Sequence, residues 1–251
     1  MAQPFISIRN LHKRLGSQHV LRGFDLEVTE GETIVIIGRS GGGKSVLLKH
    51  IIGLMKPTSG EVFVESRNVV ELSERKLSEV RKKIAILFQS AALFDSMTVE
   101  DNIAFPLREI GVRDPKVIAQ KVAEALEMVD LAGEQKKMPE KLSGGMRKRV
   151  GLARAIVTQP RCILYDEPTT GLDPIVADSI NHLIRRLQKR LGVTSIVVTH
   201  DMKSAFHVAD QIAYLHEGRV YFKGTQEELR AASDPLIRDF IEGHSHEDDA
   251  R

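Results

Sequence analysis

Residues 33–45 read Thr-Ile-Val-Ile-Ile-Gly-Arg-Ser-Gly-Gly-Gly-Lys-Ser, and this stretch decides the fold class. The apolar run 33–37 stops at a glycine, which is typical of a strand buried on both faces. The next eight residues fit G-x-x-x-x-G-K-[ST], in which a glycine-rich backbone points successive N–H groups at phosphate oxygens. A helix is expected from residue 44 to about residue 52, and its N-terminus adds the positive end of the helix dipole. The stretch therefore predicts a strand, a phosphate-binding loop and a helix.

The loop residues have distinct roles in this hypothesis. Lys44 places a positive charge on the β- and γ-phosphates of a nucleotide, and the Ser45 hydroxyl can ligate magnesium. The predicted nucleotide-binding set is Gly38, Arg39, Ser40, Gly41, Gly42, Gly43, Lys44, Ser45 and Val46. The alternative, a flexible glycine-rich turn, is disfavoured because a strand precedes the loop and a helix follows it.

A second apolar run ends in two carboxylates, Asp166 and Glu167, followed by Pro168. A phosphate-binding loop needs an acidic element that holds magnesium and orients water. Neighbouring side chains on a strand face opposite sides, but at the strand end the chain can turn, so both carboxylates can reach one site. We assign Asp166 to the magnesium shell and Glu167 to the attacking water, as general base or orienting group. An exposed acidic pair is the alternative.

Short β-branched runs alternate with helical stretches, which predicts an α/β fold with a mainly parallel sheet. The other predicted strands cover residues 5–9, 24–28, 61–65, 84–88, 162–165, 194–199, 211–215 and 220–223. We expect one domain over residues 5–243 and a polar tail over 244–251.

Residues 90–155 have few strand signals and several helical ones. A helix is predicted over 115–131, and its apolar stripe consists of Val117, Val122, Ala125, Leu126 and Val129. We interpret this region, about 90–158, as a helical subdomain inserted between strands of the sheet. More helices around a single core are the alternative.

Composition excludes several classes of protein. The 251 residues include 36 basic and 34 acidic ones, a formal charge of +2, which disfavours a nucleic-acid binder or a polybasic membrane anchor. The single cysteine, Cys162, excludes an internal disulfide and is expected in the core. No apolar run approaches the roughly 18–20 residues that cross a bilayer, and the first residues lack the pattern of an export signal. We therefore expect a cytoplasmic location.

Residues 142–146, Leu-Ser-Gly-Gly-Met, resemble the LSGGQ signature of ABC ATPases, with Met146 where glutamine is usual. Three other marks of that family follow the expected order: Gln89 fits the Q-loop, Asp173 the D-loop and His200 the switch histidine. The resemblance covers nearly the whole chain. It implies a P-loop NTPase (RecA-like) ABC ATPase core, an antiparallel β subdomain and an inserted helical signature subdomain. It also implies that the chain binds and hydrolyses ATP with Mg²⁺.

The same resemblance implies roles for these residues. His200 would contact the γ-phosphate and orient water, although a plain strand-end histidine is the alternative. Gln89 would touch magnesium and report occupancy to a membrane permease. Ser143, Gly144, Gly145 and Met146 begin a helix whose free N–H groups form a second anion site. In the family this signature closes on the nucleotide of another subunit, so a second copy of the chain is expected head to tail.

The segment from Ser90 to Glu109 and the SGGM form of the signature resemble the ATPases of Mla/Mce lipid-transport systems. This implies an MlaE-type permease that moves phospholipid between inner and outer membranes, and a peripheral position on the cytoplasmic face of the inner membrane. It also implies a small STAS-domain regulator and a periplasmic MCE-domain lipid-binding protein. The alternatives are the ATPase of an amino-acid or other small-solute importer and a soluble ABC ATPase acting on nucleic acid, although no nucleic-acid partner is expected.

The chain departs from the family pattern near Leu15, where an aromatic residue usually stacks on adenine. We expect adenine to pack on aliphatic surface or under Arg14 or Arg22 instead. Two other features are given an ordinary interpretation. The basic residues Arg147, Lys148, Arg149 and Arg154 are expected to make interdomain or solvated contacts, and His244 and His246 only faintly resemble a metal-binding tract.

Overall fold

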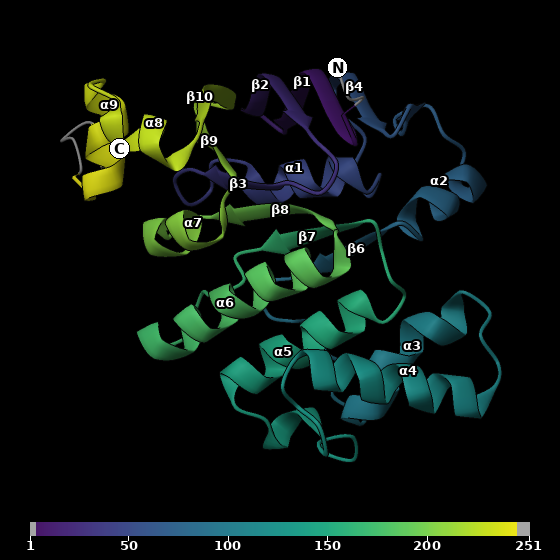
Figure 1. The fold of residues 1–251 in the computed structure, drawn as a ribbon. Coiled ribbons are helices and arrows are strands. Elements are labelled where there is room, and N and C mark those ends of the chain that lie inside the picture. The colour runs from purple at the N-terminus through teal and green to yellow at the C-terminus, as the bar shows by residue number, and fades with distance from the viewer. Residues whose placement is uncertain (1–3, 245–251) are drawn as a thin grey trace.

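The computed structural model describes residues 4–244 and consists of two sheets with helices packed around them (Figure 1). The strands are β1 (Ile6–Leu15), β2 (Gln18–Val28), β3 (Thr33–Ile37), β4 (Ser59–Val64), β5 (Arg67–Asn68), β6 (Ile84–Leu87), β7 (Cys162–Asp166), β8 (Thr194–Thr199), β9 (Gln211–His216) and β10 (Arg219–Gly224). The helices are α1 (Lys44–Ile51), α2 (Glu74–Arg81), α3 (Val99–Glu109), α4 (Pro115–Met128), the 3₁₀ helix η1 (Pro139–Lys141), α5 (Gly144–Ile156), α6 (Pro174–Leu191), α7 (Met202–Val208), α8 (Gln226–Ala231) and α9 (Pro235–Glu242). The described part of the tail is His244, and residues 245–251, including His246, lie outside the described residues.

The central sheet has six strands in the order β10-β9-β3-β8-β7-β6. Strands β9, β3, β8, β7 and β6 run parallel, and β10 is antiparallel to β9. Strand β3 is buried on both faces, with Ile34 and Ile36 packing into one core and Val35 and Ile37 into the other. A continuous apolar run is what such a strand requires, because helices cover both faces of a parallel sheet. The predicted α/β fold class is confirmed.

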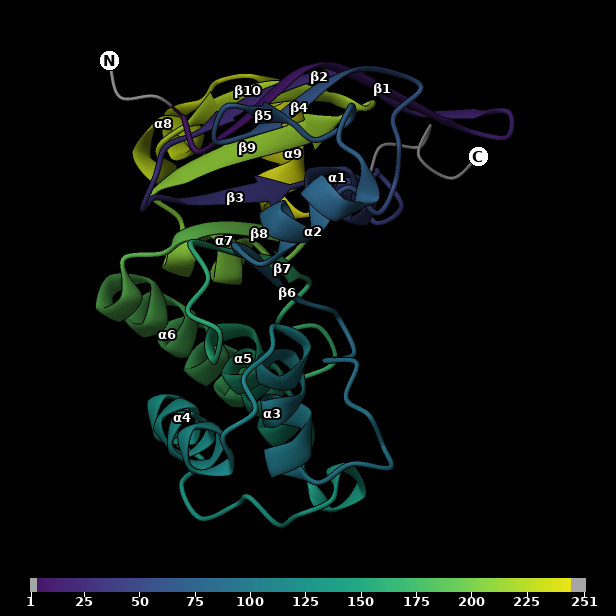
Figure 2. The same cartoon turned by 90° about the vertical axis from the view of Figure 1, so that its right-hand side faces the viewer.

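The second sheet is antiparallel, with the order β2-β1-β4-β5, and α1 lies between it and the central sheet (Figures 1 and 2). Strands β1 and β2 extend much further than the predicted segments 5–9 and 24–28. Register shifts follow Ile8 and Leu11, and these irregularities break the apolar alternation from which the shorter strands were predicted. The prediction missed the hairpin that carries Leu15 at its tip.

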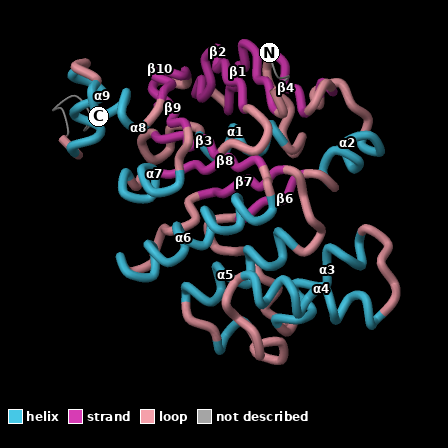
Figure 3. The backbone as a smooth tube through the Cα atoms, in the orientation of Figure 1, coloured by secondary structure: helices cyan, strands magenta, loops and turns pink. Residues whose placement is uncertain are grey.

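Between β6 and β7, the described residues 88–161 form helices and loops without a strand, and they lie at one end of the molecule (Figure 3). The predicted helix over 115–131 is present as α4 but ends at Met128, three residues earlier than predicted, and one residue of its predicted stripe is wrong. Val117 is exposed and Ile118 is buried, with Val122, Ala125 and Leu126 on the same inner face. Ile118 precedes Val122 by four residues and so lies on the same face of the helix, whereas Val117 precedes it by five and points elsewhere.

None of the helices in residues 4–244 combines the length and the apolar character needed to cross a membrane. Cys162 is buried in the core at the start of β7, as predicted.

Candidate nucleotide-binding and catalytic site

The candidate residues gather at one edge of the central sheet, because parallel strands end on the same side. Strand β3 leads into the loop 38–43, β7 ends at Asp166, β8 is followed by His200, and β6 is followed shortly by Gln89. A cavity of about 250 Å³ lies at this edge. Its lining residues are Leu15, Gln18, Val20, Ser40, Gly41, Gly43, Lys44, Ser45, Val46, Gln89, Glu167 and His200. The structure therefore brings together residues that are up to 185 positions apart in the chain, from Leu15 to His200.

The loop between β3 and α1 depends on glycine at its last position. Gly43 has a φ of 98°, and a Cβ added there would lie 2.8 Å from Cγ1 of Val20. The next residue, Lys44, is buried and its ammonium donates to the carbonyl oxygens of Gly38 at 2.7 Å and Arg39 at 3.0 Å. Burial lowers the pKa of Lys44, and the neighbouring Glu167 carboxylate partly offsets that effect. The Lys44 ammonium thus contacts backbone carbonyl oxygens of the loop, and the oxygens of a bound phosphate can replace these contacts.

A second pair links α1 to the end of β7. The Ser45 hydroxyl donates to Oδ1 of Asp166 at 2.7 Å. Burial raises the pKa of Asp166, the Ser45 hydrogen bond lowers it, and the nearby Glu167 raises it again. A half-buried carboxylate beside a hydroxyl is a donor set suited to Mg²⁺, which prefers oxygen ligands, so these residues fit that ion. Gln89 lines the same cavity and can add an amide oxygen.

Glu167 reaches the same side as Asp166 because the backbone leaves strand geometry at that point. Its φ is +49°, in the left-handed region, and its backbone N–H donates to the Val198 carbonyl at 2.9 Å. A non-glycine residue in this conformation costs roughly 1–3 kcal/mol and is found most often at functional sites. The turn at the strand end that the sequence predicted is therefore present.

The Glu167 carboxylate is buried and has four polar neighbours. One of its oxygens lies 3.0 Å from Nδ1 of His200, and Oε1 lies 3.5 Å from Nζ of Lys44. The hydroxyls of Thr170 and Thr199 donate to Oε2 at 3.1 and 3.3 Å. A carboxylate held in this way can accept a proton from a water molecule, and the imidazole beside it can orient the same water.

The signature residues lie at the N-terminus of α5. Ser143 is the N-cap, and its hydroxyl accepts from the Met146 N–H at 3.2 Å. A Cβ on Gly145 would lie 2.6 Å from Cγ1 of Val176 on α6, so glycine permits the close packing of the two helices. Ser143 is exposed. Residues 143–146, all of which the structure describes, are not among the residues that line the cavity containing Lys44.

Asp173 performs a similar capping role for α6. Its side chain accepts from the N–H groups of Ile175 at 3.1 Å and Val176 at 3.0 Å. Ile175 is 83% exposed, which is unusual for an isoleucine at a helix start. The D-loop therefore presents an apolar side chain outward beside the cap.

Two of the basic residues that were expected to make interdomain or solvated contacts connect α5 to the segment after Gln89 and to the end of β7, and sequence reasoning did not predict these particular contacts. Lys148 is 5% exposed, and its ammonium donates to the carbonyl oxygens of Gln89 and, at 3.4 Å, Glu167. Arg154 donates to the carbonyl of Ala92 at 2.7 Å and also to that of Ala91. Helical spacing was the available signal, because Lys148 follows the buried Gly145 by three residues and therefore points to the same inner face.

The segment after Gln89 is also held by a buried asparagine that the sequence did not single out. Asn102 donates to the carbonyls of Phe94, Met97 and Thr98 at 3.0–3.1 Å, and its side-chain oxygen accepts from the Phe94 N–H at 2.8 Å. The loop 94–98 is thus wrapped around one side chain.

Aliphatic side chains of the β1–β2 hairpin line the same cavity. Leu15, 43% exposed, and Val20 line the cavity with the phosphate-binding loop. The lining residues include neither of the expected arginines, and Arg22 instead donates to the His19 carbonyl at 3.0 Å. Of the expected alternatives, the aliphatic surface agrees with this geometry.

Comparisons with known proteins agree with this arrangement. Residues 21–170 match the ABC transporter family. The chain is 41% identical over 245 residues to the intermembrane phospholipid transport system ATP-binding protein MlaF of Haemophilus influenzae, covering 98% of this chain and 93% of that protein. It is 40% identical over 238 residues to the probable ribonucleotide transport ATP-binding protein mkl of Mycobacterium leprae, covering 95% and 69%. It is also 40% identical to the Fe(3+) ions import ATP-binding protein FbpC of Pasteurella multocida, of which it spans 63%.

Solved structures give the same result. A dimeric, post-hydrolysis state of the ATP-binding cassette MJ0796 bound to ADP and Pi superimposes with a TM-score of 0.80 and 33% identity, covering 88% of this chain and 98% of that one. The structure of cbiO1 from Clostridium perfringens, part of the ABC transporter complex cbiONQ, has a TM-score of 0.83 and 29% identity, covering 94% of both chains.

Proposed function

The chain belongs to the ABC transporter family as an ATP-binding and ATP-hydrolysing protein, and from this premise we propose that it energises phospholipid transport between membranes. The observation that carries the proposal is the near-complete match to MlaF, which covers 98% of this chain and 93% of that relative. The match includes the segment after Gln89, which in the family faces the membrane subunit. We further propose that residues 5–243 act as one domain, with the helical region about 90–158 inserted in it.

The proposed hydrolysis uses the charges that already surround Glu167. Lys44 contacts two loop carbonyls and the Glu167 carboxylate. We expect the β- and γ-phosphates of ATP to take over this cation, which frees the carboxylate to accept a proton from the attacking water. His200, 3.0 Å from Glu167, then orients that water and contacts the γ-phosphate.

Ser45, Asp166 and Gln89 are the residues that would hold Mg²⁺. When bound there, the ion supplies positive charge that neutralises the β- and γ-phosphate oxygens. The Asp166 carboxyl must be ionised to serve as a ligand for Mg²⁺. Burial raises the pKa of this carboxyl, which favours its protonated form.

We propose that two copies of the chain act head to tail, each signature covering the nucleotide of the other. Three observations support this arrangement. Ser143 at the signature is exposed, the described residues 143–146 are outside the set that lines the chain's own nucleotide cavity, and Ile175 beside Asp173 is 83% exposed. An apolar side chain and a free helix N-terminus at one surface suit a contact that forms when a nucleotide is bound.

A groove beside the Gln89 segment is the proposed contact with an MlaE-type permease. It encloses about 640 Å³ between α2, β6 and α3. Phe94 and Ile110 line it and are 41% and 42% exposed, and Arg154 connects the same groove to α5. An amphipathic helix from a membrane protein would bury these apolar groups. A position on the cytoplasmic face of the inner membrane, a STAS-domain regulator and an MCE-domain protein belong to the same proposal.

The test is reconstitution of the purified chain with its permease in vesicles that carry labelled phospholipid. We expect ATP-dependent movement of the label, and loss of that movement when Glu167→Gln replaces the wild-type chain. ATP-dependent uptake of a small solute or of Fe³⁺, without movement of phospholipid, would favour the alternative that the chain is the ATPase of an importer. The 40% identity to FbpC supports testing that alternative. Recovery of the chain only with nucleic acid would overturn both.

A further inference from the structure

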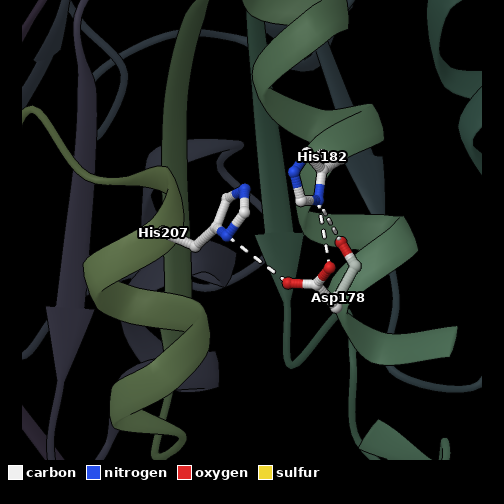
Figure 4. Close-up of side chains that lie close together, drawn as sticks. All are labelled: Asp178, His182 and His207. Carbon is white, nitrogen blue, oxygen red and sulfur yellow. Dashed lines mark hydrogen bonds and ion pairs between the residues drawn. The ribbon is translucent and has the colours of Figure 1, made fainter. Parts of the chain in front are cut away.

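Three side chains that can ligate a metal ion lie close together, outside the residues that line the cavity at the phosphate-binding loop (Figure 4). Asp178 and His182 are one turn apart on α6, and His207 comes from α7. Nδ1 of His182 lies 3.2 Å from Oδ2 of Asp178, and Nδ1 of His207 lies 3.5 Å from Oδ1. The two imidazole rings are 4.1 Å apart between centroids and meet edge to face. We propose that Asp178, His182 and His207 form a binding site for a divalent transition-metal ion of the zinc class.

The distances suit such an ion. Zinc binds imidazole nitrogen and carboxylate oxygen at roughly 2.0–2.2 Å in tetrahedral geometry, which places neighbouring ligand atoms about 3.3–3.6 Å apart. His182 Nδ1 lies 3.2 Å from one oxygen of the Asp178 carboxylate and His207 Nδ1 lies 3.5 Å from the other, both close to that spacing. One ligand atom from each of the three residues lies within 4.8 Å of the others.

The chemistry of the donors selects the class of ion. Two imidazoles with one carboxylate favour zinc, cobalt, nickel or copper over magnesium and calcium, which prefer oxygen ligands. Asp178 and His182 are well exposed, with 61% and 65% of their side-chain surfaces accessible, so water can complete the coordination. Both rings are positioned to hydrogen-bond to the Asp178 carboxylate, and His182 Nδ1 also lies 3.0 Å from the backbone carbonyl oxygen of Asp178.

The position of the cluster gives it a mechanical consequence. Helix α6 begins at the D-loop residue Asp173, and α7 begins directly after His200 and Asp201. Asp178 also lines a cavity of about 620 Å³ together with His200 and Gly171. An ion bound to side chains of both helices would join α6 to α7, and thereby restrain the D-loop relative to the switch histidine.

Zinc chloride and cobalt chloride are the probes for this site. The full-length chain, without a purification tag and with His244→Asn and His246→Asn to remove the tail histidines, is titrated in excess magnesium chloride, which saturates the oxygen ligands near Asp166. We expect one zinc equivalent per chain by calorimetry, a cobalt absorption band typical of nitrogen and oxygen ligation, and greater hydrogen-exchange protection in α7. His182→Asn and His207→Asn should each weaken binding at least tenfold and abolish the added protection.

The matched control is the other histidine pair, His12 and His19, whose ring nitrogens lie 3.3 Å apart on the β1–β2 hairpin. Replacing both with asparagine should leave the zinc titration unchanged. Because His182 is exposed and His207 is partly exposed, the variants should melt at the wild-type temperature without metal, which separates a lost ligand from a lost fold. Zinc binding that survives both His182→Asn and His207→Asn, or binding without saturation at one equivalent, would overturn the proposal. Failure of phospholipid transport would not affect it.

Discussion

Replacing Lys148 with methionine tests whether α5 holds the catalytic segments in place. The ammonium of this 5% exposed side chain donates to the carbonyls of Gln89 and Glu167, so one residue of the signature helix contacts the Q-loop and the carboxylate-bearing strand end. Methionine has nearly the same length and volume but has no donor.

The stability change should be small because two large contributions oppose each other. Hydrogen bonds from a charged donor contribute about 1.5–3 kcal/mol each, whereas removing an ammonium from water costs several kcal/mol. Burial lowers the pKa of Lys148, in the direction expected for such a cost, and the Asp166 and Glu167 charges offset part of that effect. We expect the free energy of unfolding to change by about 1 kcal/mol, measured by urea denaturation.

The effect on catalysis should be much larger. Without Lys148 the backbone at Gln89 and Glu167 is free to shift, and a displacement of about 1 Å in a catalytic site can reduce the rate about 100-fold. We expect kcat for ATP hydrolysis to fall by about that factor with KM for ATP nearly unchanged, and the magnesium concentration for half-maximal rate to rise, because Gln89 is a proposed ligand.

Two variants make the result specific. Lys148→Gln keeps a donor at the same position and should recover part of the rate, whereas Lys116→Met removes an exposed lysine from α4 and should leave every parameter unchanged. A Lys148→Met protein with wild-type kcat and magnesium dependence would refute the reasoning. A large loss of stability together with the rate would assign Lys148 to folding and not to positioning.

Three further predictions concern the nucleotide site. Glu167→Gln should bind ATP and lose about 100-fold or more of its turnover, because the proton acceptor is gone; gel filtration with ATP should detect a persistent dimer, and normal turnover would remove Glu167 from its role. Since burial raises the pKa of Asp166, this carboxyl is protonated at a higher pH than an ordinary aspartate, so the magnesium concentration for half-maximal ATPase should increase as the pH is lowered into the acid range. A magnesium dependence that is flat across that range would contradict this. Leu15→Tyr should tighten ATP binding by about 0.5–1.5 kcal/mol, because the tyrosine ring can stack on adenine, and a nucleotide with a smaller base should gain less affinity. Equal ATP affinities for the wild-type and Leu15→Tyr proteins would show that Leu15 does not contact the base.

The motifs could be predicted because each depends on local sequence. The run 33–37 and the loop 38–45 carry their own signals, namely continuous β-branched residues and glycines followed by lysine. The same local reasoning was insufficient at the β1–β2 hairpin, where bulges interrupt the alternation, and at α4, where it took Val117 for a core residue in place of Ile118. Periodicity is a reliable signal only while the backbone keeps its regular phase.

The residues that connect the motifs could not be predicted in the same way. Lys148 is one of four basic residues for which interdomain and solvated contacts were both open, and only the packing of α5 against the Gln89 segment buries it. The turn that brings Glu167 to the side of Asp166 could be predicted from its place at the strand end, but the left-handed φ and the hydrogen bond to Val198 in the next strand that accompany the turn could not. Both features arise from contacts between segments distant in sequence, for which a single chain carries no local signal.

The order of the strands explains why those contacts decide the site. Along the chain the motifs occur as the phosphate loop, Gln89, Asp166 with Glu167, and His200, but the adjacent strands run β3-β8-β7-β6. Strand β8 therefore separates the phosphate loop from the carboxylates, and α1 spans that gap so that Ser45 donates to Asp166 at 2.7 Å. Glu167 then lies between Lys44 on one side and His200 on the other, within 3.5 Å of both. A shift of β7 by one residue would exchange Tyr165 for Asp166 at this edge, since successive side chains alternate faces. The register of β7 against β8 is therefore as essential to the proposed hydrolysis as the acidic residues themselves.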